Sequence, residues 1–155
     1  ITSPDDQSDA RRRLPMIWSK SDKTGECAFP EKNRKDLDNN EQVELGVEDQ
    51  LSTNYSLTNH YRKVINVRNK YPFIKHSVFT GMVDELNRAD NQYLMAYKLS
   101  LGDDYIIVVH NFNQYSVEMT APGNEILDEI NTNGLKPSLK DGKLGLGAYS
   151  TVIMK

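Results

Sequence analysis

The chain has 155 residues, of which 26% are charged and 37% hydrophobic, and its formal net charge is −3 at pH 7. This mildly acidic balance argues against a broadly basic nucleic-acid-binding surface. No apolar run approaches the length needed to cross a membrane. Cys27 is the single cysteine, so neither an internal disulfide nor a thiolate metal cage is expected.

Residues 1–54 are polar, and their scattered apolar residues keep no sustained period. This pattern predicts a long loop. A structureless stretch of that length is uncommon inside a compact domain, so we expect it to be a functional loop or to lie across a surface that the chain does not supply. The chain also begins at Ile1 without an initiator methionine or a leader peptide, which predicts a longer parent protein.

A helical period follows over residues 56–71. Ser56 is the expected N-cap, and Pro72 is expected to end the helix because a residue before proline avoids the α region. An amphipathic helix is stable when another surface covers its apolar side. The expected stripe consists of Leu57, Tyr61, Val64, Ile65 and Arg68.

The period changes to that of β-strands from Val78 onward. Over residues 93–100, Tyr93, Met95, Tyr97 and Leu99 alternate with Leu94, Ala96, Lys98 and Ser100, which predicts one core face and one wetter face. A turn at 102–104 and a continuous apolar run at 105–109 predict a hairpin with a central strand. Further strands are expected at 116–120, 125–130 and 151–154. Short strands separated by such turns indicate an antiparallel sandwich.

One segment imitates a calcium-binding loop. Asp36, Asp38 and Asn40 match its first ligand positions, but Glu41 replaces the required glycine and Val47 stands where the bidentate acid should be. We therefore expect no calcium site there.

The remaining chemical groups form no self-contained active site. His60, His76 and His110 lack metal-ligand spacing, and Cys27 has no activating neighbour. The basic run at 11–13 lies among acidic neighbours, which favours a solvated or locally paired cluster over a phosphate site. The acids of the expected sandwich are interpreted as turn or surface residues. They are Asp84, Glu85, Asp103 and Asp104.

Two motifs in chain order resemble the α-amylase family of glycoside hydrolases (family 13). The sequence PDD at 4–6, followed by RLPMIWS at 13–19, resembles the signature after the family's eighth barrel strand. The segment YSLTNHYRKVINVRNKYP at 55–72 resembles its last barrel helix. Residues 93–97, 106–113 and 148–153 are similar to its terminal domain.

The resemblance implies a mainly β fold in two parts. Residues 1–72 would be the end of a (β/α)8 catalytic barrel, consisting of a long loop and one amphipathic helix. Residues 73–155 would be the C-terminal antiparallel β-sandwich domain.

The resemblance also implies a parent that acts on α-glucosidic bonds of starch, maltodextrin or related α-glucans with retention of configuration. Its catalytic carboxylates would lie upstream, so the chain alone is expected to hold no catalytic residue and to be inactive. Its partners would be the missing barrel and an α-glucan, without nucleic acid or membrane. No cofactor is expected in this chain, and any calcium would belong to the missing part. An extracellular or cell-surface location suits such a parent, although a cytoplasmic one stays open.

Arg13 is the one candidate for substrate binding, because the loop after a barrel strand opens onto the catalytic face. The alternative is an arginine that braces the loop by pairing with Asp5, Asp6 or Asp9, and this alternative is favoured. Trp18 could stack on a sugar, although an anchoring role in the loop is favoured for it too.

Two other classes of function compete with an amylase-type enzyme. One is a carbohydrate-binding module with an exposed aromatic surface. The other is a non-catalytic amylase-like protein retained for assembly. The tyrosines that could form the binding surface are Tyr93, Tyr97, Tyr105, Tyr115 and Tyr149.

Overall fold

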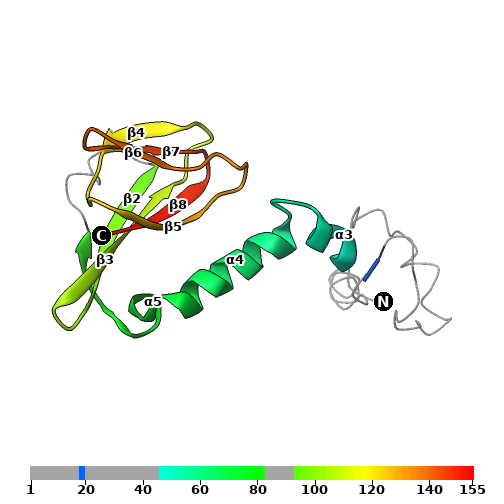
Figure 1. The fold of residues 1–155 in the computed structure, drawn as a ribbon, viewed down its shortest axis with the longest axis horizontal. Coiled ribbons are helices and arrows are strands. Elements are labelled where there is room, and N and C mark those ends of the chain that lie inside the picture. The colour runs from blue at the N-terminus through cyan, green and yellow to red at the C-terminus, as the bar shows by residue number, and fades with distance from the viewer. Residues whose placement is uncertain (1–17, 20–45, 83–92) are drawn as a thin grey trace, which may run out of the picture. The chain divides into compact units, whose positions relative to one another are not determined.

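The computed structural model describes residues 18–19, 46–82 and 93–155 (Figure 1). The chain divides into two compact units, Ile1–Thr58 and Asn59–Lys155. The helices are α3 (Val47–Ser52), α4 (Leu57–Lys70) and α5 (Pro72–His76). The strands are β1 (Val78–Met82), β2 (Leu94–Leu101), β3 (Asp104–Asn111), β4 (Val117–Thr120), β5 (Ile126–Ile130), β6 (Ser138–Lys140), β7 (Lys143–Leu146) and β8 (Ser150–Met154).

The first unit contains a short helix where a continuous loop was expected. Helix α3 has 6 residues, and the Asp49 carboxylate accepts the Gly46 N–H at 2.9 Å, which satisfies a backbone donor at the helix start. The prediction of loop throughout 1–54 is therefore wrong at this helix. So short a helix shows less than two turns of apolar period, which the sequence pattern cannot reveal.

The long helix of 56–71 is confirmed as α4, Leu57–Lys70, which begins in the first unit and continues in the second. Gln50 helps to start it, because its side-chain oxygen accepts the Thr58 N–H at 3.1 Å. Tyr71 is extended and Pro72 opens α5, so the proline both ends one helix and begins another that was not predicted.

The predicted stripe of α4 is not the side that packs against the sandwich. Val67, outside that stripe, is the buried residue of α4, at 3% exposure. Leu57, Tyr61 and Ile65 remain 67%, 60% and 53% exposed. The helix therefore contacts the sandwich through its C-terminal half and leaves its expected apolar side largely uncovered.

The second unit contains the expected antiparallel β-sandwich. Its five-stranded sheet has the order β1-β2-β3-β8-β5, and its three-stranded sheet has the order β4-β7-β6. All neighbouring strands pair antiparallel. Figure 1 shows the small sheet lying over one face of the large one. We call that face of the five-stranded sheet its inner face.

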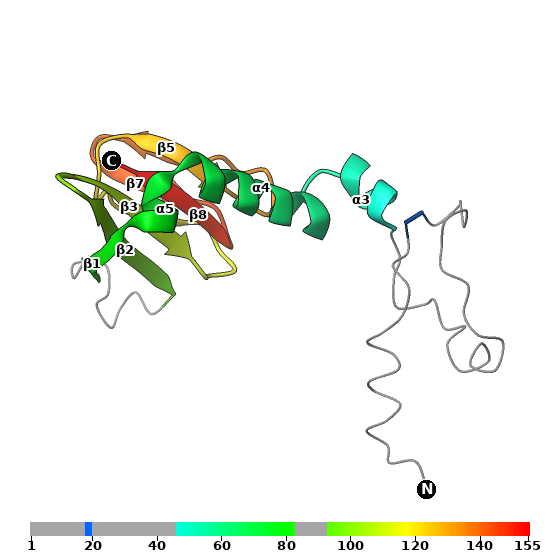
Figure 2. The same cartoon turned by 90° about the horizontal axis from the view of Figure 1, so that it is seen from below.

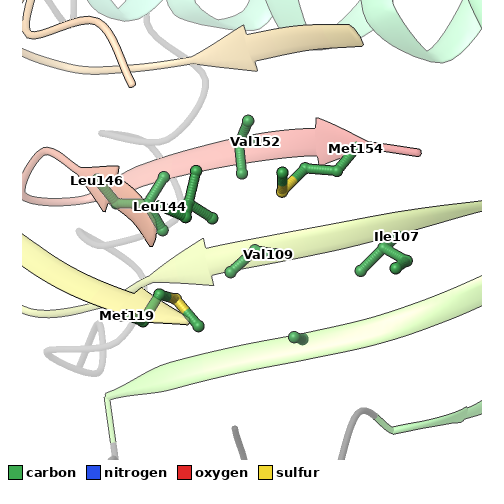
Figure 3. Packing of buried hydrophobic residues seen from close by; sticks show 8 residues of the cluster. Ile107, Val109, Met119, Leu144, Leu146, Val152 and Met154 are labelled. Carbon is green, nitrogen blue, oxygen red and sulfur yellow. The ribbon is translucent and has the colours of Figure 1, made fainter. Parts of the chain in front are cut away.

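The core between the two sheets is apolar and closed (Figure 3). Side chains from β3, β8, β4 and β7 meet there, and burying each large aliphatic side chain contributes about 1.5–3 kcal/mol. The cluster consists of Ala96, Ile107, Val109, Met119, Leu144, Leu146, Val152 and Met154.

Strand β3 is the central strand that its apolar run predicted. Ile107 and Val109 face the inner core, while Ile106 and Val108 belong to a second cluster on the opposite, outer face. The hairpin of β2 and β3 turns at Gly102, whose φ of 63° suits glycine.

The prediction of one core face and one wetter face on β2 is wrong. Ala96 is fully buried in the inner core, whereas Tyr97 and Leu99 pack against the outer cluster. Both faces of β2 are covered because α5 packs against this strand on the outer side. A strand covered on both faces loses the simple alternation of apolar and polar residues.

The expected strands at 116–120, 125–130 and 151–154 are present as β4, β5 and β8. The hairpin of β6 and β7 was not predicted. Asp141 and Gly142 have φ angles of 50° and 73°, as a tight hairpin turn requires. With 3 and 4 residues, these strands are too short to show a period.

A charged clamp fastens α4 to β5. The Asp128 carboxylate lies 2.7 Å from Lys63 Nζ and 2.9 Å from Lys70 Nζ. Tyr71 Oη donates to the Leu127 carbonyl at 2.9 Å. Burial alone would raise the pKa of Asp128, but hydrogen bonds from Lys63, Lys70 and the Glu129 N–H lower it to about 2. Figure 2 shows α4 and α5 along the outer face of the large sheet.

Candidate functional site

Several sequence-predicted residues lie outside the described part of the chain. Arg13, the candidate for substrate binding, is among them, and its role stays a prediction. The same holds for the basic run at 11–13, Cys27 and the incomplete calcium loop at 36–41. The remaining acidic residues that the sequence analysis singled out and that lie outside the described part are Asp5, Asp6, Asp9, Asp84 and Glu85.

The end of the amylase-like signature packs closely against the start of α3. The Trp18 carbonyl accepts the Glu48 N–H at 2.8 Å, and Ser19 is buried. A Cβ on Gly46 would lie 2.7 Å from Ser19 Cα, so only glycine permits this approach of two backbones. The backbone of Trp18 is therefore anchored, while its side chain is 48% exposed. Whether the ring contacts sugar stays a prediction.

The acids of the β2–β3 turn have structural partners or face solvent. Asp103 and Asp104 are exposed, and the Asp104 carboxylate lies 2.7 Å from Lys155 Nζ. The side-chain hydrogen bond from Lys155, assisted by the Tyr105 N–H, lowers the pKa of Asp104. These features match the interpretation of both residues as turn and surface acids.

The histidines do not assemble a metal site within the described residues, where no group of three or more His, Cys, Asp or Glu could hold an ion. The ring centroids of His60 and Tyr61 lie 6.3 Å apart. His110 is different, because it sits within a row of aromatic side chains on the outer face of the large sheet.

This row was not predicted, and we name it the aromatic patch: Phe79, Tyr97, His110 and Phe112. Successive ring centroids are 6.1, 5.6 and 5.5 Å apart, from Phe79 to Phe112. Antiparallel pairing places alternate residues of β1, β2 and β3 side by side on one face. The signal available in the sequence was the two-residue spacing of Val108, His110 and Phe112.

Polar atoms inside the aromatic patch are mutually satisfied. His110 Nδ1 lies 2.8 Å from Thr151 Oγ1, and His110 Nε2 lies 3.3 Å from Tyr97 Oη. Burial lowers the pKa of His110 and raises the pKa of Tyr97, so both groups are favoured in their neutral forms. The patch therefore combines neutral polar groups in its centre with exposed phenyl rings at its ends.

A buried asparagine organises the loops at the end of β3. Asn111 donates from Nδ2 to the carbonyls of Tyr115 and Gly147, and its Oδ1 accepts the Asn113 N–H. Tyr149, two residues after Gly147, has a backbone in the left-handed region with a φ of 49°. This network fixes two loops that carry the exposed Tyr115 and Tyr149.

The tyrosines considered for a carbohydrate-binding surface do not share one environment. Tyr93, Tyr115 and Tyr149 are exposed, whereas Tyr97 and Tyr105 are partly buried. Tyr97 belongs to the aromatic patch, and Tyr105 packs against the inner core beneath Lys98, whose Nζ lies 3.8 Å from the ring centroid. The five residues therefore do not form a single binding surface.

The described part thus defines a β-sandwich with a helix fastened to one sheet, and no metal centre built from His, Cys, Asp or Glu appears in it. Residues 94–153 match the family model "Alpha-amylase SusG C-terminal domain". By similarity, the chain corresponds to the C-terminal part of α-amylase-family proteins.

Two curated relatives agree with this assignment. Alpha-amylase 3 of Dictyoglomus thermophilum is 34% identical over 101 residues, which cover 64% of this chain and 19% of the relative. Alpha-amylase SusG of Bacteroides thetaiotaomicron is 26% identical over 97% of this chain and 21% of its own length. The chain therefore spans about a fifth of these relatives.

The fold agrees as well. The solved structure of Eubacterium rectale Amy13B superposes with a TM-score of 0.73 at 22% identity, covering 89% of this chain and 26% of that protein. At this identity the likeness concerns the fold alone. In the described residues, no helix is long and apolar enough to cross a membrane.

Proposed function

We propose that this chain serves as the C-terminal part of a longer glycoside hydrolase that acts on α-glucosidic bonds of starch, maltodextrin or related α-glucans. The observation that carries the proposal is the match of the sandwich to the SusG C-terminal domain over residues 94–153. Two relatives named α-amylase align with the chain over only 19% and 21% of their lengths. Most of such a protein would lie outside this chain.

In this proposal, residues 1–72 complete the catalytic barrel and residues 73–155 form the sandwich. The retaining reaction needs a carboxylate nucleophile and a carboxylic acid about 5 Å apart. We place both in the upstream barrel, because the acids of the β2–β3 turn are exposed and Asp104 is paired with Lys155. The chain alone should therefore be inactive.

Arg13 is our candidate for a residue near the substrate, since the signature at 13–19 would follow the last barrel strand. Any calcium would bind in the upstream part, and this chain would hold no cofactor of its own. For a parent that degrades polysaccharide, we propose an extracellular or cell-surface location.

The test compares the 155-residue chain with the complete polypeptide that contains it. Release of reducing ends from starch and maltodextrins is measured for both. We expect turnover from the complete polypeptide, none from the chain, and loss of turnover when the upstream nucleophile is changed to its amide. An inert complete polypeptide with intact folding would favour a non-catalytic amylase-like protein and would overturn the proposal.

A substitution separates the two roles considered for Arg13. In the complete polypeptide, Arg13→Lys should raise KM for maltodextrin without lowering thermal stability if Arg13 contacts substrate. A drop in stability with unchanged KM would instead identify a residue that braces the loop.

A further inference from the structure

Within the first unit, the start of helix α3 approaches residues 18–19 more closely than a side chain would allow. Gly46 precedes the helix, and a Cβ there would lie 2.7 Å from Ser19 Cα and 2.8 Å from the Trp18 carbonyl carbon. Ordinary van der Waals contacts of a Cβ begin at 3.4 Å. The atoms in the way belong to the backbone, which cannot change rotamer as a side chain can. Any larger residue at position 46 must therefore displace residues 18–19.

Space, and not backbone conformation, requires glycine at position 46. Its φ of −71° and ψ of 175° are extended values that any residue adopts. Two hydrogen bonds hold this region together. The Asp49 carboxylate accepts the Gly46 N–H at 2.9 Å, and the Glu48 N–H donates to the Trp18 carbonyl at 2.8 Å. A substitution of Gly46 would therefore act mainly by separating the start of α3 from the chain at 18–19.

The contact holds the backbone of residues 18–19 and leaves much of Trp18 uncovered. Ser19 is buried, whereas Trp18 is 48% exposed. These two residues end the signature at 13–19, in which Arg13 is our candidate for a residue near the substrate. In a barrel enzyme, loops that follow the strands open onto the catalytic face. A displacement at the end of the signature would thus pass along the chain to the loop that faces the substrate.

We infer that Gly46 is a positioning residue for α-glucan binding: it lets α3 dock on the backbone at the end of the signature and so sets where the substrate-facing loop lies. This inference rests on the proposed function. Gly46 itself would touch no substrate. A Cβ at position 46 would need a shift of about 0.7 Å to move from 2.7 Å to ordinary contact at 3.4 Å. A misplacement of about 1 Å can lower the rate of an enzyme about 100-fold, so a shift of this size is large enough to matter.

The test measures the dissociation constant of maltoheptaose by isothermal titration calorimetry. It uses the complete polypeptide with its upstream nucleophile changed to the amide, so that the sugar is not consumed. Gly46→Ala is compared with Gly123→Ala as the matched control. A Cβ at Gly123 would lie 2.7 Å from the Lys155 carbonyl oxygen, so the control introduces an equally close backbone clash within the sandwich. Circular dichroism and thermal unfolding check that both variants are folded and record their loss of stability.

We expect Gly46→Ala to weaken maltoheptaose binding at least about 10-fold, because the groups that contact the sugar are displaced. Gly123→Ala should lose stability but leave the affinity unchanged. On the polypeptide with its nucleophile intact, Gly46→Ala should raise KM with little change in kcat, since the reacting carboxylates lie elsewhere.

A second variant decides the matter if Gly46→Ala does not fold. Asp49→Asn weakens the bond to the Gly46 N–H without adding atoms. It should weaken maltoheptaose binding in the same direction by a smaller factor. Unchanged affinity in this variant, when Gly46→Ala is unfolded, would overturn the inference.

The outcomes separate this inference from the proposed function. Unchanged affinity in a folded Gly46→Ala, or equal weakening by Gly123→Ala, would overturn the inference alone if the complete polypeptide is active. Binding that weakens in Gly46→Ala on a polypeptide that is inert even with its nucleophile intact would defeat the proposed function alone. A complete polypeptide that neither binds nor cleaves maltoheptaose would overturn both.

Discussion

The two faces of the five-stranded sheet differ in how far the described residues cover them. The inner face is closed by the three-stranded sheet, and Val109 and Val152 on that face, like Leu144 of the three-stranded sheet, have no exposed surface. The outer face is covered by α4 and α5 at one end and exposes the aromatic patch at the other. The inner core should therefore support folding of the sandwich, whereas the outer face contributes a smaller covered cluster and leaves aromatic rings exposed.

The largest expected effect comes from truncating the inner core. Leu144→Ala should lower the free energy of unfolding by about 2–5 kcal/mol, because the cavity forms where the two sheets meet. Phe112→Ala, on the outer face, should cost less than about 1 kcal/mol in the isolated chain, since its ring is largely exposed. Urea unfolding followed by circular dichroism measures the free energy of unfolding of both variants. Similar losses for the two variants would remove the distinction between the faces.

The Asp128 clamp should have an intermediate effect, because it fastens α4 to the edge of the sheet. Asp128→Asn should cost about 1–2 kcal/mol at neutral pH, less than a fully buried pair would, since both lysines are about half exposed. Glu118→Gln is the control, because the Glu118–Lys143 pair is exposed and should contribute less than about 0.5 kcal/mol.

The clamp also predicts a pH dependence. The pKa of Asp128 is lowered from 3.8 to about 2 in the folded state. Its stabilisation should therefore be complete above pH 3.8 and be lost as the pH falls through about 2. Acid titration of the midpoint of unfolding should show this loss in the wild type and not in Asp128→Asn. The same acid sensitivity in both would show that the clamp does not contribute.

His110 should give a smaller and differently placed effect. Burial lowers its pKa below the ordinary 6.5, so its neutral form stabilises the fold above that pH, and the contribution is lost as the pH falls through the lowered value. We expect less than about 1 kcal/mol, and His110→Gln should remove the dependence. An NMR titration of the His110 ring checks the direction. A pKa above 6.5 would contradict the burial of the ring.

Local sequence patterns predicted the elements that carry a long period. Helix α4 and the β2–β3 hairpin are such elements, and the resemblance at 55–72 pointed to the same helix. The pattern assigned the helix face less well, because apolar spacing alone did not show that Val67 rather than Tyr61 would be buried. The choice depends on which neighbouring surface is present, and a missing neighbour leaves an apolar stripe exposed.

The remaining misses have the same kind of cause. Alternation predicted one core face and one wetter face for β2, but Ala96 is buried on one face while α5 covers the other. Helix α5 lies elsewhere in the chain, so the pattern of β2 alone does not reveal it. The aromatic patch is assembled from three strands, so no local window contains it. Arg13 was selected from a family signature, and its role stays a prediction.

Native-state hydrogen exchange on the monomeric chain tests the contrast between the two faces most directly. Amides of β3 and β8, such as Ile107, Val109 and Val152, should exchange only through global unfolding, because the inner core holds them. Amides in the N-terminal half of α4, near Tyr61, should exchange at least about 100-fold faster through local opening, since that half contributes no buried residue. Equal protection of these α4 amides and of Val109 would show that the chain completes both faces by itself and would contradict the account.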